Sequence, residues 1–281
     1  MAFKVEQGGV WRTIGGRRVY IKDGQGLADA MRESGKFQKT TNDYMVRKWT
    51  TKVEKNKTND LKPFEKQDVN IEKVKERGNL TDEEAKECIK QAEEVFAEAE
   101  ALEPQISNDV INSSVATDGK MWGLDFRMKQ PESLAAKIGA DAKGDNISFD
   151  KASANVKDVV RYTVVYDDDN FVSGYNNFRD EMQSRGYTET RLKNFYELYR
   201  DGKACQKAVQ CVYETENGYL FEVQFHTDSS QGAKEVNHPY YEKYRDKTTP
   251  DSRKQNLDKI MRDNGRLVKD PKGVYTIKSH G

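Results

Sequence analysis

The chain has 281 residues, and its 47 Lys and Arg balance its 47 Asp and Glu, with 33% of residues charged and 35% hydrophobic. No segment approaches the ~18 consecutive apolar residues of a transmembrane helix, and the first thirty residues lack the apolar core of a secretory signal. Aromatic residues make up 10% of the chain, which argues against general disorder. These features exclude a membrane-spanning protein and predict a soluble folded one.

Cysteine and histidine are scarce, with three of each. Cys88, Cys205 and Cys211 lack paired or metal-type spacing, which predicts free thiols in a reducing compartment. The histidines are too scattered for a zinc motif, so any bound metal is expected to have oxygen ligands.

Charge is unevenly distributed along the chain. Residues 1–80 hold 18 Lys and Arg against 11 Asp and Glu, residues 81–110 hold 2 against 10, and residues 243–281 hold 11 against 5. The two basic ends could face a polyanion, or they could be ordinary solvated surfaces.

The N-terminal segment begins with two alternating runs, 10–14 and 17–21, joined by two glycines. A two-residue hairpin turn of this kind needs positive φ at both positions, which glycine adopts freely, so the pattern predicts a β-hairpin tag over 1–33. The following stretch, rich in Lys, Thr and Asn, predicts a linker or loosely ordered arm over 34–74.

From residue 75 to 281 helical and strand patterns alternate, which predicts an α+β (α/β-like) domain with a mixed sheet of about five strands. Thr81 and Glu84 form a capping-box pattern at the start of a helix, and Pro104 is expected to interrupt that helix. The expected helices are 82–102, a further stretch to 114, 131–138, 171–185, 229–245 and 250–267. The expected strands are 121–128, 159–166, 207–213, 219–225 and, in a last hairpin, 274–278.

The first candidate functional segment surrounds the proline at position 131. Strand alternation would place Arg127 and Lys129 on one face, while Ser133 and Lys137, four residues apart, would share a helix face. The start of that helix offers free N–H groups and the positive end of the helix dipole. These groups could converge on a polyphosphate, or they could be ordinary surface residues.

Two further segments place polar side chains on predicted strands. Asp158 and Arg161 lie at the head of the strand 159–166, where the carboxylate could hold magnesium and the guanidinium could contact a base or a phosphate. Glu222, Gln224 and His226 alternate onto one face of the last long strand. Glu222 could complete the magnesium site and accept a hydroxyl proton.

These segments, in this order, resemble the RelA/SpoT-type nucleotidyltransferase domain, with the toxic small alarmone synthetases as the most similar branch. The resemblance covers about residues 75–250 and lies in the combination of motifs. It rests on Arg127, Lys129, Ser133 and Lys137, then Asp158 and Arg161, then Glu222, Gln224 and His226, followed by Lys234, His238, Tyr241 and Arg245.

The resemblance implies transfer of the β,γ-pyrophosphate of ATP to a hydroxyl group, with Mg²⁺ as cofactor. It assigns ATP binding to Arg127, Lys129, Ser133, Lys137 and Arg161. Asp158 and Glu222 would hold magnesium, and Glu222 would also be the base that deprotonates the acceptor 3′-hydroxyl. Acceptor-binding or supporting roles would fall to Gln224, His226, Lys234, His238 and Arg245.

One stretch departs from the family pattern. Synthetases that use guanosine nucleotides carry a base-stacking tyrosine where this chain has Cys205 or Gln206. Phe195, Tyr196 or Tyr199 could replace it, or could simply pack a helix. The acceptor is therefore left open among a guanosine nucleotide, an adenosine nucleotide and the tRNA 3′ end, the last of which would suit the basic C-terminal region.

Nothing in the chain resembles the metal-dependent hydrolase half of the long bifunctional enzymes, so synthesis without hydrolysis is expected. Such an activity would be toxic and would call for a neutralising antitoxin or immunity partner. The segment 10–24 resembles a short tag of phage minor head proteins. That resemblance suggests a phage or prophage toxin, acting in the bacterial cytoplasm and packaged in a virion, or else the hairpin is an unrelated edge hairpin.

Two other functions remain open at this stage. The chain could be a virion structural or interaction protein with a catalytically silent nucleotide-binding domain. It could also be a nuclease toxin, for which His226 with Glu222 is the available pair. Retention of the acidic and basic set around Asp158 and Glu222 favours the enzyme.

Overall fold

A computed structural model describes residues 9–14, 17–22, 43–246 and 249–281. The chain divides into two compact units, Met1–Lys48 and Trp49–Gly281, and each is described by itself. Within the described ranges, no helix combines the length and the apolar character needed to cross a bilayer.

The first unit contains the predicted hairpin. Strands β1 (Gly9–Ile14) and β2 (Arg17–Lys22) pair antiparallel from Gly9 opposite Lys22 to Ile14 opposite Arg17. The hairpin prediction is confirmed by this pairing. The two turn glycines and residues 34–42 of the predicted linker lie outside the described residues.

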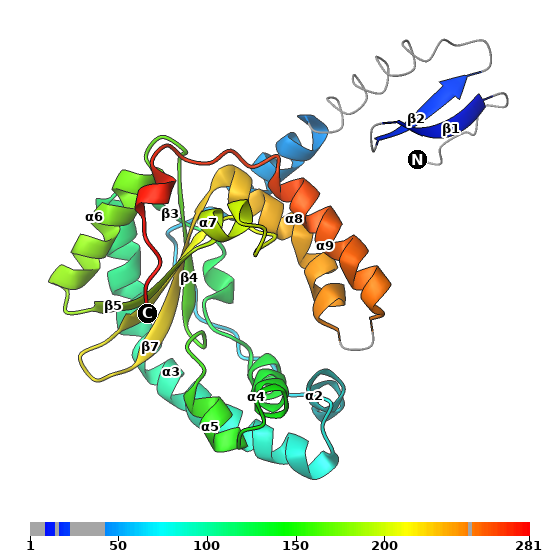
Figure 1. The fold of residues 1–281 in the computed structure, drawn as a ribbon. Helices are drawn as coiled ribbons and strands as arrows, with labels where there is room; N and C mark the ends of the chain where they lie inside the picture. Colours follow the sequence, from blue (N-terminus) through cyan, green and yellow to red (C-terminus); the bar gives the residue numbers. More distant parts are fainter. Residues whose placement is uncertain (1–8, 15–16, 23–42, 247–248) are drawn as a thin grey trace. The chain divides into compact units, whose positions relative to one another are not determined.

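A mixed five-stranded sheet organises the second unit (Figure 1). Its strands are β3 (Lys120–Met121), β4 (Arg161–Tyr166), β5 (Thr188–Asn194), β6 (Val209–Glu214) and β7 (Leu220–Thr227), in the order β3-β4-β7-β6-β5. Only β4 and β7 run parallel, and the other neighbours are antiparallel. The predicted α+β class with a mixed sheet of five strands is confirmed.

Helices flank this sheet. They are α2 (Ile71–Gly78), α3 (Asp82–Ala116), α4 (Pro131–Asp145), α5 (Phe149–Ala154), α6 (Phe171–Ser184), α7 (Phe195–Arg200), α8 (Asp228–Arg245) and α9 (Asp251–Gly265). Thr81 and Glu84 form the predicted capping box at the start of α3. The predicted break at Pro104 is wrong, because α3 continues through it and buries apolar side chains on both sides of the proline, among them Phe96 and Ile106.

The two faces of the sheet differ in chemistry. Tyr162 and Tyr166 of β4 point toward α3, where their hydroxyls lie 2.8 Å from Ser107 Oγ and 2.7 Å from Thr117 Oγ1. Val223 and Phe225 of β7 share this apolar core, as predicted. The opposite side of the sheet carries what we call the polar face, made of Arg161, Thr163, Gln210, Glu222, Gln224 and His226.

The segment between β3 and α4 is not the long strand expected over 121–128. After the two-residue β3, Gly123 takes a positive φ of 63° and begins the 3-10 helix η1 (Leu124–Phe126). Only Met128 returns to the sheet, through a single bridge to Val160. Glycine in the left-handed region ends the strand here, because the chain turns at that position.

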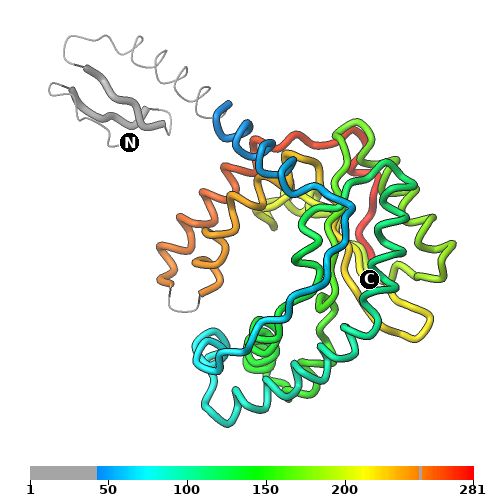
Figure 2. Tube along the Cα trace, turned by 180° about the vertical axis from the view of Figure 1, so that it is seen from behind, coloured from blue at the N-terminus to red at the C-terminus, as the bar shows by residue number. Residues whose placement is uncertain are grey.

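Residues 49–57 belong to the folded unit and are not a loose tether, contrary to the linker prediction. Trp49 and Val53 are 1% and 0% exposed. Ion pairs join Lys52 to Glu235 at 2.9 Å and Lys57 to Asp228 at 3.0 Å, both on α8. Residues 57–70 then run in extended form to α2 (Figure 2). Trp49, a large apolar residue within a polar stretch, is the feature of the sequence that indicates this packing.

Gly232→Ala is expected to destabilise the second unit by about 1–3 kcal/mol, because a Cβ at this position of α8 would collide with the Trp49 side chain. Gly144→Ala in α4 is the matched control, since nothing beyond its own turn of helix lies within 4 Å of the added methyl group. The control should be neutral or stabilising by about 0.5–1 kcal/mol. Urea denaturation measures both, and equal effects would show that Trp49 does not pack against α8.

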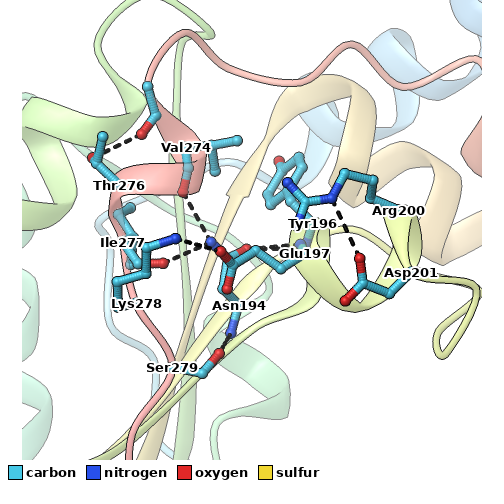
Figure 3. Close-up of polar contacts among 11 residues, drawn as sticks. Asn194, Tyr196, Glu197, Arg200, Asp201, Val274, Thr276, Ile277, Lys278 and Ser279 are labelled. Atoms are coloured by element: carbon cyan, nitrogen blue, oxygen red, sulfur yellow. Dashed lines mark hydrogen bonds and ion pairs between the residues drawn. The ribbon is translucent and has the colours of Figure 1, made fainter.

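The C-terminal segment forms no hairpin, contrary to the prediction for 274–278. It contains the 3-10 helix η2 (Val274–Thr276) and is tied to β5 by Asn194, which is fully buried (Figure 3). The Asn194 side chain donates to the carbonyls of Val274 at 2.8 Å and Ile277 at 2.9 Å. Prolonged strand pairing is replaced by this amide and a single bridge from Leu192 to His280.

Candidate functional site

Backbone hydrogen bonds bring three separate segments of the chain to one end of the polar face. Arg161 lies opposite Glu222 in the parallel pairing of β4 and β7, and the Glu222 N–H donates to Val160 O at 3.0 Å. On the other side of β4, the Lys129 N–H donates to Val159 O at 2.8 Å. Residues 129, 161 and 222 therefore lie side by side although the sequence separates them widely.

An ion pair forms the centre of this region. Lys129 Nζ lies 3.0 Å from Asp158 Oδ2, and the two side chains are only 12% and 24% exposed. Burial acts to raise the pKa of Asp158, but the charges of Lys129, Lys137 and Arg161 lower it below its ordinary value. Burial lowers the pKa of Lys129, and Arg161 adds to that effect. Asp158 is therefore ionised at neutral pH, among three cations.

Lys137 approaches the same carboxylate from α4. It pairs with Asp141 at 2.7 Å and remains 32% exposed. Burial opposes its charge, but Asp141 and Asp158 raise its pKa. Ser133 lies one turn earlier on the same face of α4, and no side chain caps the start of that helix. The uncapped N–H groups at the start of α4 are therefore free to receive an anion, and Lys137, although paired with Asp141, adds positive charge beside them.

Glu222 is buried and held in one orientation. Only 5% of the residue is exposed, and each carboxylate oxygen accepts a hydrogen bond from an amide, one from Gln210 and one from Gln224. The Gln224 carbonyl in turn accepts from Lys234 Nζ. A buried carboxylate with fixed direction is suited to accepting a proton from a hydroxyl group.

Lys234 lies on α8 beside this network and is partly buried. Burial, with a further contribution from Arg161, lowers the pKa of the Lys234 ammonium to about 8, although Glu222 and Glu235 act in the opposite direction. The Lys234 ammonium donates to the Gln224 side chain, so in this geometry it does not contact the acceptor substrate directly. It supports the position of Gln224 and hence of Glu222.

Lys234→Met is expected to stabilise the fold relative to wild type at pH 7, by about 1–3 kcal/mol, and less as the pH rises. Below about pH 8 the lysine is charged in both states, so the folded chain carries the full burial penalty. Between about pH 8 and its ordinary value near 10.5 the unfolded chain binds more protons, so wild-type stability rises with pH. Chemical denaturation from pH 7 to 10.5 measures this, with exposed Lys259→Met as control. A pH-independent difference would contradict it.

His226 lies at the other end of β7 from Glu222. It is 1% exposed, and its Nδ1 lies 2.9 Å from Ser230 Oγ. Burial holds its pKa well below 6.5, so the imidazole is neutral. His226 is four positions further along β7 than Glu222, a distance of about 13 Å. The pair proposed for a nuclease is therefore not assembled, and His226 organises the start of α8.

His238 and Arg245 lie on the exposed part of α8. Both interact with Glu242, at 3.9 and 3.8 Å, and their side chains are 67% and 57% exposed. Although the pKa of Lys137 is raised overall, the charge of Arg245 acts in the opposite direction, so the two side chains lie within electrostatic range of each other. Of the two, Arg245 is the better placed to act together with Lys137.

Arg127 is not on the same face as Lys129, which corrects the prediction made from strand alternation. Its backbone is helical, with φ −66° and ψ −20°, so alternation does not apply. The guanidinium Nε lies 2.5 Å from Glu103 Oε1 of α3, and the pair is 3% and 9% exposed. The guanidinium donates its hydrogen bonds to groups of the protein itself, so in this geometry it does not contact a phosphate.

Two residues of the site region were missed by the sequence analysis. Glu103, the partner of Arg127, was visible only as a polar residue on the buried side of a helix. Gln210 stands out in the sequence only as a polar residue between Val209 and Cys211, on the strand before Glu222. Neither has a motif, because each acts on a residue remote in sequence.

The arrangement fits a divalent cation held by protein and phosphate oxygens together. Within the described ranges no cluster of three metal-ligating side chains occurs. Asp158 Oδ1 is buried and accepts no hydrogen bond in the described structure, so it is left free for a cation. Magnesium commonly uses one or two carboxylates with substrate phosphates, which suits Asp158 and Glu222.

The aromatic residues considered as guanine platforms are mostly occupied in the fold. Tyr196 is fully buried, and the Tyr199 hydroxyl donates to Arg262 O at 2.7 Å. Phe195 is half-buried, and so is Cys205, whose pKa is raised by burial. The first two therefore pack the fold, which leaves Phe195.

Comparison with models of known protein families found no match, and a search of curated proteins found none. Among solved structures, the chain is similar to the type VI effector Tas1 in complex with its immunity protein (19% identity, TM-score 0.43, 63% of this chain and 96% of that chain). It is also similar to small alarmone synthetase 1 from Bacillus subtilis bound to its product pppGpp (17%, 0.36, 50% and 71%). A third is a GTP pyrophosphokinase family protein from Streptococcus pneumoniae (18%, 0.40, 65% and 88%). Because all three identities are below 20% and all three TM-scores below 0.5, the function of this chain has to be argued from its own side chains.

Proposed function

We propose that this chain is a magnesium-dependent pyrophosphokinase that transfers the β,γ-pyrophosphate of ATP to a hydroxyl of a nucleotide or of the tRNA 3′ end. The observation that carries the proposal is the position of Glu222. This oriented carboxylate lies opposite Arg161 on the polar face, next to the segment that holds Lys129 and Asp158. A base and a cationic phosphate site thus occupy one end of one sheet face.

The reaction forms one bond and breaks one. The acceptor hydroxyl oxygen bonds to the β-phosphorus of ATP, the bridge between the α- and β-phosphates breaks, and AMP leaves with the bonding electrons. Glu222 takes the hydroxyl proton. Lys129, Lys137 and Arg161 offset the negative charge of the phosphates and hold them in line, which is the main contribution an enzyme makes to such transfers.

Asp158 and Glu222 would hold the magnesium ion, which would supply charge neutralisation at the phosphates. Ser133 and the N-terminus of α4 would add hydrogen bonds to the same phosphates. Arg127, by contrast, is assigned to the fold through Glu103. A silent binding module would have no use for an oriented Glu222 beside the phosphate site, so catalysis is preferred.

The acceptor class is tested by incubating the protein with magnesium, γ-labelled ATP and one acceptor at a time. Guanosine nucleotides, adenosine nucleotides and bulk tRNA are offered separately. Transfer of label to one of them supports the proposal and names the class. Absence of transfer to every acceptor, with ATP still bound, would overturn it in favour of a silent nucleotide-binding module.

A pyrophosphokinase without a hydrolase half would inhibit growth of a bacterial host. The proposal therefore includes action as a toxin in the bacterial cytoplasm and control by a neutralising antitoxin or immunity protein. The minor head protein resemblance of the hairpin, with packaging in a virion, remains a prediction. Expression in bacteria with and without Glu222→Gln tests the toxicity, because only an active site should arrest growth.

A further inference from the structure

An aromatic pair lies beside the proposed site and has no role in the account so far. The rings of Trp122 and Phe126 lie near one another, with centroids 6.4 Å apart and planes 26° apart. Phe126 is 64% exposed, which is high for a phenylalanine that is not at a chain end. Gly123 makes this possible, because its positive φ folds the chain back and brings the Phe126 ring over it.

The pair belongs to the polar side of the sheet. Met121 of β3 lies opposite Val164 and points into the core, so the next residue, Trp122, points to the other side. The Trp122 N–H donates to Thr163 O at 2.9 Å, which places Trp122 across from a residue of the polar face. Arg161 and Glu222 therefore lie on the same side of the sheet as the Trp122 side chain.

Residues 122–129 follow β4 from the aromatic pair to the phosphate site. Trp122 is hydrogen-bonded to Thr163 at one end, and Lys129 to Val159 at the other. Val159 and Thr163 are four positions apart along the chain, which is about 13 Å in a strand. A nucleoside triphosphate spans such a distance between its base and its terminal phosphate. With the phosphates at Lys129, the base would reach the aromatic pair.

Trp122 also carries a polar atom that the fold leaves without a partner. Its indole N–H is buried and meets no acceptor within the part of the chain that the structure describes. A buried donor without a partner is costly, and a ring nitrogen of a base can accept from it. The neighbouring Phe126 offers an exposed ring face to the same base.

We propose that Phe126 and Trp122 form the stacking site for the adenine of the ATP donor. This inference rests on the proposed function, because it takes the phosphates to lie at Lys129 and Lys137. Phe126 supplies a ring face to the base, and the Trp122 N–H donates to a ring nitrogen. Stacking of a base on an aromatic side chain is independent of the phosphate contacts, so the two contributions can be measured separately.

The test compares binding of two probes in the presence of magnesium. One is α,β-methylene-ATP, in which the bond that would break is replaced, and the other is inorganic triphosphate, which has no base. Phe126→Ala should weaken α,β-methylene-ATP about 5- to 100-fold and leave triphosphate unchanged. Trp122→Phe keeps a ring but loses the N–H, and should weaken the nucleotide about 2- to 10-fold. Val115→Ala, at an exposed apolar position on α3, is the control and should change neither.

The outcomes separate this inference from the function on which it rests. If wild type binds α,β-methylene-ATP and Phe126→Ala binds it equally well, the aromatic pair only covers the sheet edge and the inference is overturned. Equal weakening of both probes would show a structural defect at the phosphate site and would overturn it too. If wild type binds neither probe, the proposed function itself fails.

Discussion

Glu222→Gln is expected to lower the rate of pyrophosphate transfer by about 100- to 10,000-fold, the usual contribution of a general base. The amide cannot accept the hydroxyl proton. It would also present an N–H₂ group to Gln210 or Gln224, whose amides now donate to the carboxylate. The measurement is the rate of AMP release with saturating ATP and the identified acceptor.

Binding of ATP should weaken much less than the rate, because Lys129, Lys137 and Arg161 still face the phosphates and Asp158 still offers a carboxylate to magnesium. Glu197→Gln on α7 is the matched control, since that carboxylate is also partly buried and pairs with a lysine, Lys278, at 2.8 Å. It should leave the rate unchanged. If Glu222→Gln retained more than a tenth of the wild-type rate, Glu222 would not be the base.

Arg127→Met is expected to destabilise the second unit by about 3–5 kcal/mol, because it leaves the Glu103 carboxylate buried without its partner. That carboxylate also accepts from Ser107, whose hydroxyl contacts Tyr162 of β4, so the loss reaches the core face of the sheet. Glu103→Leu should cost a similar amount by leaving the guanidinium unpaired. Urea unfolding measures both.

The double variant Arg127→Met with Glu103→Leu distinguishes this role from phosphate binding. Removing both charges should restore most of the stability, because an apolar pair of similar volume carries no desolvation cost. The double variant should also keep its affinity for ATP. Loss of affinity for ATP in Arg127→Met with little change in stability would reverse the assignment and return Arg127 to the donor site.

The elements that the sequence predicted well are those with a strong local signal. The hairpin has its two glycines, α3 has its capping box, and β4 is a run of buried residues between polar ends. The errors arose where distant contacts outweigh local preference. Pro104 is accommodated because one side of α3 is buried along the length of the helix. Asn194 replaces a C-terminal hairpin by donating to the carbonyls of Val274 and Ile277.

Part of the candidate site was accessible from the sequence for the same reason. Alternation correctly placed Glu222, Gln224 and His226 on one face of β7, because that strand is regular. The same rule failed at Arg127, where Gly123 and η1 remove the strand. The partnership of Arg127 with Glu103 could not be predicted, since the two residues are joined only by the packing of α3 against the sheet.

The central claim is that this chain moves pyrophosphate intact from ATP to an acceptor hydroxyl. The most direct measurement is the fate of ATP labelled separately at the β- and γ-phosphates, with the acceptor that accepts label. The account predicts that both labels appear together on the acceptor and that one AMP forms for each acceptor modified. Formation of ADP, or transfer of the γ-label without the β-label, would contradict it.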